Sequence, residues 1–312
     1  MNIGVLGGGS FGIALSTHLA RKGYGVRVWE IDSKRVDGIN NGHHDLLDVD
    51  LPDNILASSE LSVVQDCPIV LMAVPSQFVE STCRKVKKYL GEETVVVCCS
   101  KGFDPSGKLL FEVIEKVLDY PVAVLSGPSF AKEIIEGNLT GVTIAGSKKV
   151  TEELAEVFSS KTFYVEQSDD PRGVQLAAGF KNVLAIVTGI VSKEGHNGQT
   201  LLLTKGFHDL VHFVVSNGGK VETCYSLAGF GDVILTCTGS LSRNRQFGTL
   251  LGEGKSKKQA LDEVGMVVEG VKALEIVKKL AKKKKLTLPT VDFLDGVLSG
   301  KDVDAMITKL LA

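Results

Sequence analysis

Short apolar runs rich in β-branched residues alternate with amphipathic stretches over the first half of the chain. In order, these runs are NIGVL, VRVWE, IVLMAV, TVVVCC, AVLS, GVTIAG and TFYV. Such alternation is typical of a parallel sheet with helices on both faces. It predicts an α/β domain over residues 1–168.

The hydrophobic pattern changes after residue 168, where the apolar runs become longer and recur at helical spacing. Pro171 suits the first turn of the first of these helices. A chain of 312 residues is long enough for about two domains. We therefore expect a second, mostly α-helical domain over residues 169–312.

The most apolar stretch is GVQLAAGFKNVLAIVTGIV, residues 173–191, which carries a single charged residue, Lys181. Its length would suit a membrane span, but a lysine at the centre of a span costs about 3 kcal/mol. A helix that is apolar on every side is a buried helix. The sequence therefore predicts no membrane span and a lysine in the interior of the fold.

Charge and cysteine content exclude several classes of protein. The 35 basic and 37 acidic residues nearly balance, which argues against a surface that binds nucleic acid. The first residues show no cationic segment before an apolar one, so we expect no secretory signal and a cytoplasmic location. The six cysteines include no C-x-x-C pair, and they are expected to be buried, reduced thiols without a metal site.

The first apolar run is followed by Gly7, Gly9 and Gly12 in the pattern G-x-G-x-x-G, and then by a helical stretch. In this context one glycine makes the turn, one admits a pyrophosphate, and one allows close packing of helix and strand. The phosphates then lie at the helix N-terminus. Glu30 ends the second run, where an acid can accept hydrogen bonds from a ribose. These features predict a Rossmann-type doubly wound sheet that binds a dinucleotide.

Three other motifs resemble those of different enzyme classes, but each match is incomplete. Residues 8–12 also spell G-x-S-x-G, but the nucleophile elbow of hydrolases normally follows several strands, not the first. Residues 129–132 match S-x-x-K without its companion motifs. Residues 208–212 place two histidines four apart, yet the glutamate of a zinc helix and a third ligand are missing. A hydrolase and a zinc enzyme are therefore disfavoured.

Lys181 suits a dehydrogenase mechanism. Hydride transfer to a ketone leaves negative charge on its oxygen, which a nearby cationic acid stabilises and protonates. On a helix, Lys181 shares a face with small residues that leave room for a ligand: Ala177, Ala178, Ala185 and Thr188. The neighbouring Asn182 can orient a substrate or a cofactor amide.

A second polar constellation is GFGDVILTCTGSLSRNR, residues 229–245. Asp232, in a glycine-flanked loop, suits an ion pair with the Lys181 ammonium. Ser242 is expected to cap the following helix, which places Arg243 and Asn244 in its first turn. Backbone N–H groups together with a guanidinium form a phosphate site, so a phosphorylated substrate is expected.

The glycine motif, SKG at 100–102, SGPSFAKE at 126–133, GFKN at 179–182 and the LTCT to SRNR block occur in this order. Together they resemble the bacterial NAD(P)-dependent glycerol-3-phosphate dehydrogenases over nearly the whole chain. The resemblance implies reversible reduction of dihydroxyacetone phosphate to sn-glycerol 3-phosphate, which feeds phospholipid synthesis.

The resemblance also assigns site residues. It makes Lys181 the general acid/base and a substrate contact, with Asn182 beside it. The other residues that match the family's substrate positions are Lys101, Gly127, Ser129, Asp232, Ser242, Arg243 and Asn244. Those that match its cofactor positions, beyond the three motif glycines and Glu30, are Ser10, Phe11, Lys101, Ala131, Arg243, Val267 and Glu269.

One departure bears on the choice of cofactor. Many family members carry a basic residue or histidine where this chain has Ile31, next to Glu30, which should repel the 2'-phosphate of NADP. Lys34 and Arg35 lie nearby in the sequence and could compensate for it. NAD or NADP is therefore expected, with NAD favoured.

Two alternatives remain open from the sequence. β-Hydroxyacid dehydrogenases and ketopantoate reductases share the domain order and an interior lysine, but they recognise a carboxylate instead of a phosphate. A dinucleotide sensor without turnover would not need the set of Lys181, Asp232 and Arg243. The apolar helical domain also leads us to expect a homodimer.

Overall fold

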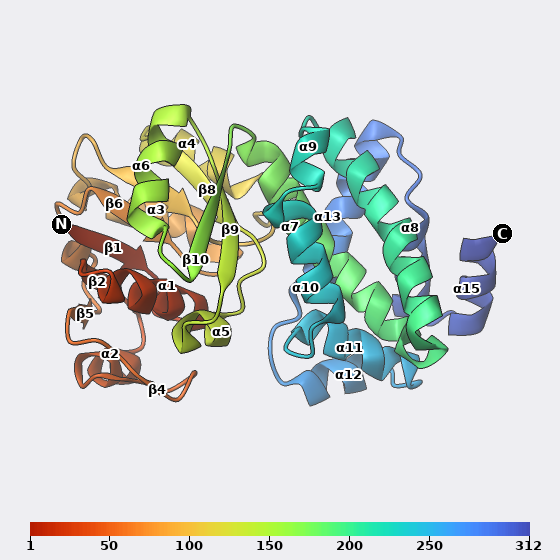
Figure 1. Ribbon diagram of the computed structural model, residues 1–312. Coiled ribbons are helices and arrows are strands. Elements are labelled where there is room, and N and C mark those ends of the chain that lie inside the picture. Colours follow the sequence, from red (N-terminus) through yellow and green to blue (C-terminus); the bar gives the residue numbers. More distant parts are fainter. The chain divides into compact units, whose positions relative to one another are not determined.

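The computed structural model describes residues 1–312 and divides into two compact units, Met1–Pro171 and Arg172–Ala312. Every strand lies in the first unit, whereas the second is built from helices (Figure 1). A Rossmann-like unit followed by a helical one is the fold class that the sequence predicts.

The first unit contains an eight-stranded sheet with the order β10-β9-β8-β7-β6-β1-β2-β5. Its strands are β1 (Asn2–Leu6), β2 (Gly25–Trp29), β5 (Ile55–Ser58), β6 (Ile69–Met72), β7 (Val95–Cys98), β8 (Val122–Ser126), β9 (Thr140–Ala145) and β10 (Phe163–Ser168). Neighbouring strands are parallel, except that β8 and β9 are antiparallel. The sheet is thus mostly parallel, as predicted, with one antiparallel pair that the sequence did not predict.

Helices of the first unit alternate with its strands. They are α1 (Ser10–Arg21), α2 (Ser33–Asn40), α3 (Val79–Val86), α4 (Leu110–Leu118), α5 (Ala131–Glu136) and α6 (Lys148–Phe158), with short 3-10 helices at Leu61–Val64, Ser76–Phe78 and Lys87–Tyr89. Helix α1 packs with α5 and α6, and α3 packs with α4. All residues of β6, β7 and β8 are buried, so both faces of the sheet are covered there.

Strand β1 marks the place where the strand order reverses, because β2 lies on one side of it and β6 on the other. Open α/β sheets bind ligands beyond the carboxyl ends of the strands at such a point. A separate antiparallel pair, β3 (His43–His44) and β4 (Val49–Asp50), follows α2. The sequence did not predict this hairpin, because its residues are mostly polar.

The second unit is helical. Its helices are α7 (Pro171–Ile190), α8 (Gly195–Ser216), α9 (Val221–Cys224), α10 (Asp232–Thr238), α11 (Arg243–Gly252), α12 (Lys257–Val264), α13 (Glu269–Lys284), α14 (Pro289–Leu298) and α15 (Val303–Leu311), with a 3-10 turn at Val191–Glu194 and a π-helical turn at Leu227–Gly231. As predicted, α7 begins at Pro171.

Helix α7 forms the core of the second unit, since every residue from Gly173 to Ile190 is buried. The segment Pro171–Ser216 is long and apolar enough to cross a membrane, yet its most apolar window is wholly buried within the fold, as in a core helix. Glycines allow close approach to α7: a Cβ atom at Gly248 would lie 2.1 Å from the carbonyl oxygen of Ile186, and one at Gly270 would lie 2.5 Å from that of Asn182. Helices α11 and α13 are thereby held against α7.

Candidate functional site

The glycine-rich turn between β1 and α1 has the form that a dinucleotide phosphate requires. Gly7 has a φ of +113°, a conformation that favours glycine. A Cβ atom at Gly12 would lie 2.0 Å from the Gly7 carbonyl oxygen, so this position admits no side chain. A Cβ atom at Gly9 would meet nothing within 4 Å. The chain thus leaves open space at the N-terminus of α1, which fits a pyrophosphate.

Cationic and aromatic groups border this turn. Helix α1 starts with Ser10 and Phe11 and has no acidic residue in its first turn. The Lys101 ammonium, from the segment after β7, lies 5.5 Å from the centroid of the Phe11 ring. Ala131 begins α5, which packs on α1. Lys101 therefore lies beside Phe11 at the start of α1, and Ala131 belongs to a helix that packs on α1.

Glu30 lies directly after β2, and its carboxylate is already engaged by backbone groups. Its Oε2 accepts a hydrogen bond from the Gly8 N–H at 2.9 Å, and its Oε1 accepts one from the Asp32 N–H at 3.0 Å. Arg35 approaches Oε1 at 3.5 Å. The expected acid at the end of β2 thus braces the glycine-rich turn.

The predicted compensation by Arg35 meets an obstacle in the structure. Besides Glu30, the guanidinium of Arg35 lies 3.2 Å from Asp45 and 3.9 Å from Asp32. Burial works against its charge, but the hydrogen bond to Asp45 and the nearby carboxylates raise the pKa of Arg35 above its usual value. Three carboxylates therefore surround the cation nearest to Glu30.

Gly127 and Ser129 follow β8. Gly127 has a φ of +148°, and a Cβ atom there would lie 2.8 Å from the Cα atom of Val142. The Ser129 hydroxyl is buried and donates to the Gly127 carbonyl oxygen at 2.8 Å. Both residues shape the turn after β8 in the first unit, whereas Lys181 and Asp232 belong to the second.

In the second unit, Lys181 and Asp232 form a buried ion pair. The exposed fraction is 3% for Lys181 and 1% for Asp232, so the predicted interior lysine is confirmed and its expected pairing is present. Thr236 joins them: the Lys181 Nζ donates to its Oγ1 at 3.3 Å, and that hydroxyl donates to the Asp232 Oδ1 at 3.2 Å. These three side chains make a closed polar triangle in an apolar interior.

Local sequence explains how Asp232 reaches α7. The π-helical turn before it is started by Ser226, whose Oγ accepts from the Gly229 N–H at 3.3 Å. A Cβ atom at Gly229 would lie 2.3 Å from the Cys224 carbonyl oxygen, so only glycine fits. Thr236 follows Asp232 by one helical turn on α10. Thr236 is not among the residues predicted from the sequence, because its i, i+4 spacing from Asp232 becomes a signal only once Asp232 is known to face inward.

A second polar chain links α7, α11 and the start of α13. The Gly270 N–H donates to Asn244 Oδ1 at 2.9 Å, Asn244 Nδ2 donates to Asn182 Oδ1 at 3.0 Å, and Asn182 Nδ2 lies 3.3 Å from Glu269 Oε2. Four residues, two of them asparagines, thus form one hydrogen-bonded chain. Asn182 and Asn244, both expected at the site, already use each end of their amides inside the protein.

The remaining predicted residues lie at helix starts. Ser242 caps α11 as expected, because its Oγ accepts from the Arg245 N–H at 3.3 Å. Arg243 is exposed in the first turn of α11. Val267 is 60% exposed just before α13. The structure therefore places Arg243 and Val267 where a ligand from solvent can reach them.

All six cysteines are buried thiols, as the sequence predicts. Burial raises the pKa of Cys237, which follows Thr236, to about 12, so it stays a neutral thiol near the ion pair.

The segment 208–212, which resembles a zinc helix, has a structural contact at its acid. Asp209, between the two histidines at 208 and 212, accepts hydrogen bonds from the Thr290 N–H at 2.8 Å and from the Thr290 hydroxyl at 2.6 Å. This buried carboxylate joins α8 to α14.

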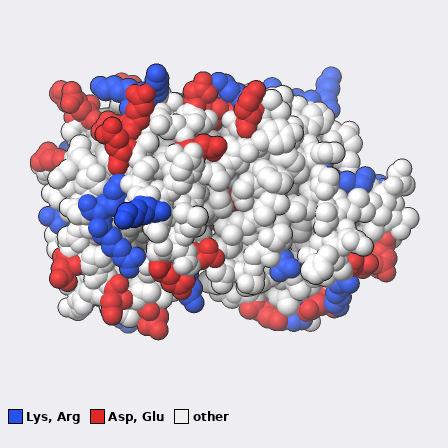
Figure 2. All heavy atoms as spheres, viewed as in Figure 1, with Lys and Arg blue, Asp and Glu red and all other residues white.

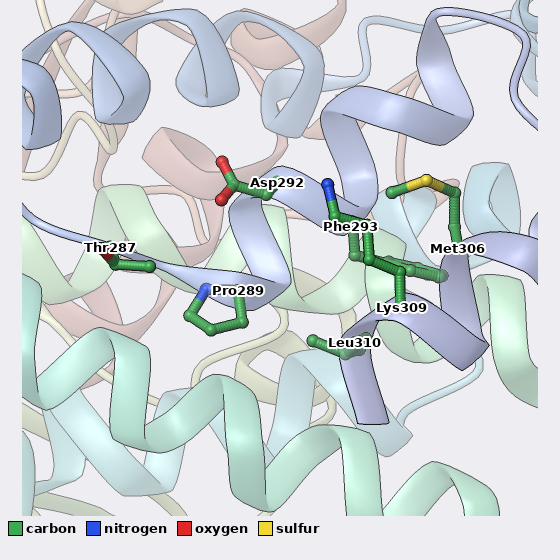
Figure 3. A pocket seen from close by; sticks show the side chains of 7 residues that line it. All are labelled: Thr287, Pro289, Asp292, Phe293, Met306, Lys309 and Leu310. Carbon is green, nitrogen blue, oxygen red and sulfur yellow. The ribbon is translucent and has the colours of Figure 1, made fainter. Parts of the chain in front are cut away.

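A separate pocket of about 200 Å³ lies at the C-terminal helices (Figure 3). Phe293, Met306 and Leu310 contribute apolar surface, and Asp292 and Lys309 also line it. None of the residues expected at the site borders this pocket. No group of three or more residues suited to bind a metal ion occurs in the structure.

Two models of one protein family match the chain, one in each unit. Residues 2–152 match the N-terminal model of NAD-dependent glycerol-3-phosphate dehydrogenase, and residues 170–308 match its C-terminal model. The chain belongs to the NAD-dependent glycerol-3-phosphate dehydrogenase family. The resemblance read from the sequence is therefore confirmed, and the protein is an oxidoreductase that uses NAD or NADP.

Relatives within the family extend over the whole chain. A glycerol-3-phosphate dehydrogenase (NAD(P)+) from Saccharophagus degradans is 38% identical, covering 98% of this chain and 88% of the relative. One from Clostridium tetani is 36% identical over 98% and 90%. The crystal structure of glycerol-3-phosphate dehydrogenase from Coxiella burnetii superposes with a TM-score of 0.93 at 34% identity, covering 99% of this chain and 98% of that one.

The alternative family gives a weaker match. A ketopantoate reductase from Ralstonia eutropha superposes with a TM-score of 0.63 at 18% identity, over the full length of both chains. Such a likeness shows a shared fold and no more. The shared fold agrees with the expectation from the sequence that the two families share their domain order.

Proposed function

We propose that this protein catalyses the reversible reduction of dihydroxyacetone phosphate to sn-glycerol 3-phosphate with NADH or NADPH, for glycerophospholipid synthesis. Family membership supports the reaction. Beyond the family, the buried set of Lys181, Asp232 and Thr236 carries the proposal. Burying an ammonium costs solvation free energy, and a buried ion pair adds little net stability, so a catalytic role explains the set better than a structural one.

Residues 1–168 hold the dinucleotide in this proposal. The motif glycines receive the pyrophosphate at the open start of α1, with Ser10 and Phe11 in its first turn. When bound, the reduced nicotinamide supplies the hydride. Glu30 and the carboxylates around Arg35 favour NADH, since a 2'-phosphate would meet negative charge at the end of β2.

Residues 169–312 supply the proton. As a hydride arrives at the carbonyl carbon, Lys181 donates a proton from Nζ to the carbonyl oxygen and leaves an alcohol and a neutral amine, which takes a proton back from solvent. Asp232 and Thr236 fix the ammonium and favour its charged form before the transfer. In the oxidation, the neutral amine accepts the hydroxyl proton.

Asn182 acts as an orienting group. Asn244 donates to its Oδ1 and Glu269 accepts from its Nδ2, so its amide cannot rotate freely. Each amide nitrogen carries a second hydrogen and each oxygen a second lone pair. The remaining donor of Asn182 can therefore orient the substrate or the nicotinamide amide.

The phosphate of the substrate binds at the start of α11. Ser242 caps this helix, and the exposed Arg243 guanidinium stands in its first turn. Backbone N–H groups and a guanidinium together favour a phosphate dianion. Lys101, Gly127 and Ser129 complete the substrate set by resemblance to the family, and Val267 and Glu269 complete the cofactor set.

A cytoplasmic homodimer is the proposed working form. The helical unit supports a dimer, because it exposes Leu201, Tyr225, Phe230 and Ile234, each at least 37% exposed. Figure 2 shows a broad area without charged residues over α8 and α10 on one face. Light scattering coupled to size-exclusion chromatography tests the dimer, and a monomer at working concentration would contradict it.

The decisive experiment follows the absorbance of reduced nicotinamide with purified protein and dihydroxyacetone phosphate. NADH and NADPH are compared in parallel, and pyruvate and ketopantoate serve as carboxylate-bearing controls. Oxidation that depends on dihydroxyacetone phosphate establishes the reaction. Oxidation of reduced nicotinamide with a keto acid instead would overturn the assignment of a phosphorylated substrate.

A further inference from the structure

His44 is a buried imidazole that contacts the glycine-rich turn. It lies in β3, has no exposed surface, and its Nε2 lies 3.0 Å from the carbonyl oxygen of Gly8. A carbonyl oxygen only accepts hydrogen bonds, so Nε2 carries the proton. The contact joins a residue of the β3–β4 hairpin to the motif that receives the dinucleotide phosphates.

Glu30 and His44 hold two successive peptide groups of this turn. The Gly8 N–H, which donates to Glu30, belongs to the peptide between Gly7 and Gly8. The Gly8 carbonyl, which accepts from His44, belongs to the peptide between Gly8 and Gly9. In a planar trans peptide the C=O and N–H bonds point in opposite directions. His44 therefore sets the direction of the Gly9 N–H.

Gly9 is the position where a ligand can approach the backbone. It is the N-cap residue of α1, with no side-chain cap, and its surroundings within 4 Å of a Cβ atom are empty. Gly8 itself has no such freedom, since a Cβ atom there would lie 3.0 Å from Glu30 Oε2. Rotation of the Gly8–Gly9 peptide would turn a phosphate-binding N–H away from the open side.

The surroundings of His44 keep it neutral and in place. Burial is the main cause that lowers the pKa of His44, and Arg35 adds to it, whereas the hydrogen bond to Gly8 and the charges of Asp45 and Glu30 oppose it. Its Nδ1 is buried without a hydrogen-bond partner, so a second ring proton would have no acceptor. Arg35 ties the hairpin to the end of β2, because it contacts both Asp45 and Glu30.

We propose that His44 is a positioning residue for the dinucleotide: by holding the Gly8 carbonyl it fixes the Gly9 N–H toward the cofactor pyrophosphate. The inference rests on the proposed function, which places the dinucleotide at this turn. His44 has no exposed surface, so it acts through the Gly8 backbone and not by direct contact with a ligand. Its contribution is therefore to cofactor binding and leaves the chemical step alone.

The test compares His44→Phe, which keeps the ring but removes the donor, with His44→Gln, which keeps a donor. His18→Phe is the matched control, because His18 is also a buried imidazole of the first unit and contacts the Phe158 carbonyl oxygen at 2.6 Å, away from the turn. The measured quantities are the Kd of NADH by fluorescence, the KM values of both substrates, and kcat.

We expect His44→Phe to raise the Kd and KM of NADH about tenfold, the effect of one lost hydrogen bond. The KM of dihydroxyacetone phosphate and kcat at saturating NADH should stay near those of the wild type. His44→Gln should recover most of the affinity, and His18→Phe should not change it. Should His44→Phe fail to fold, His44→Ala is measured in the same way.

Two outcomes overturn the inference: unchanged NADH affinity in His44→Phe, or an equal loss in His18→Phe, which would reflect general loosening of the first unit. Both are distinct from a failure of the proposed function. In that case the wild-type protein itself would neither bind NADH nor reduce dihydroxyacetone phosphate.

Discussion

Lys181 and Asp232 form an ion pair at a place where almost no water reaches either side chain. The two residues come from different helices, α7 and α10, and Thr236 hydrogen-bonds to both. Buried ion pairs add little net stability, because desolvation offsets the attraction. This balance supports the proposed role of Lys181 as the proton donor.

Removing the Lys181 ammonium should greatly lower kcat without weakening the binding of the cofactor. Lys181→Met keeps a chain of similar length but supplies no proton, and general acid catalysis is worth about 10²–10⁴-fold in kcat. NADH affinity should stay within about twofold, since the motif glycines lie in the other unit. Steady-state kinetics and NADH fluorescence measure the two quantities. Retained turnover would remove Lys181 from the mechanism.

The ion pair of Lys181 and Asp232 should also affect the free energy of unfolding. Lys181→Met removes the cation that pairs with the buried Asp232 carboxylate, which should cost about 3–5 kcal/mol of unfolding free energy. The double variant Lys181→Met/Asp232→Asn removes both charges and should recover a large part of that loss. Urea unfolding of the wild type, both single variants and the double variant tests this. Additive losses would show that the two charges are not coupled.

The interior position of Lys181 was predictable because α7 is apolar on every side, and burial is what such a pattern means. Thr236 was not found, since a threonine on a short helix carries no signal until its partner at Asp232 is known to face inward. The link between Asn182 and Asn244 was also hidden. It depends on how α7 and α11 pack, and no local pattern encodes that contact.

The sheet, too, was only partly predictable from the sequence. The apolar runs predicted β1, β2 and β6 to β10, because buried strands read as continuous β-branched segments. Their directions were only partly predictable, and the antiparallel pairing of β8 with β9 was missed. The hairpin that carries His44 was missed because polar residues dominate it. Its role depends on a contact with Gly8 that is distant in sequence.

Arg243 should read the substrate phosphate. Arg243→Ala is expected to raise the KM of dihydroxyacetone phosphate about 10–100-fold, as for the loss of a charge-assisted contact. The unphosphorylated ketone dihydroxyacetone should lose much less efficiency. Gln246→Ala, an exposed change on the same helix, is the control. Equal losses for both ketones would show that Arg243 does not bind phosphate.

Asp45 should help to set the cofactor preference. It holds the Arg35 guanidinium at 3.2 Å, and this contact reduces the positive charge available to a 2'-phosphate. Asp45→Asn should raise the kcat/KM ratio of NADPH to NADH several-fold, about the effect of 1 kcal/mol. Asp53→Asn, an exposed change further along the chain, is the control. An unchanged ratio would show that Arg35 does not reach the cofactor.

Two buried histidines should make the first unit sensitive to mild acid. Burial lowers the pKa of both His18 and His44 below the usual 6.5. The unfolded chain therefore binds protons more readily as the pH falls, so unfolding becomes easier below about pH 6.5, whereas stability is fully present above it. Urea unfolding between pH 5 and 8 measures this slope. The double variant His18→Phe/His44→Phe should have a flatter profile over this range, even if it is less stable at pH 8. An unchanged slope would assign the acid sensitivity to other groups.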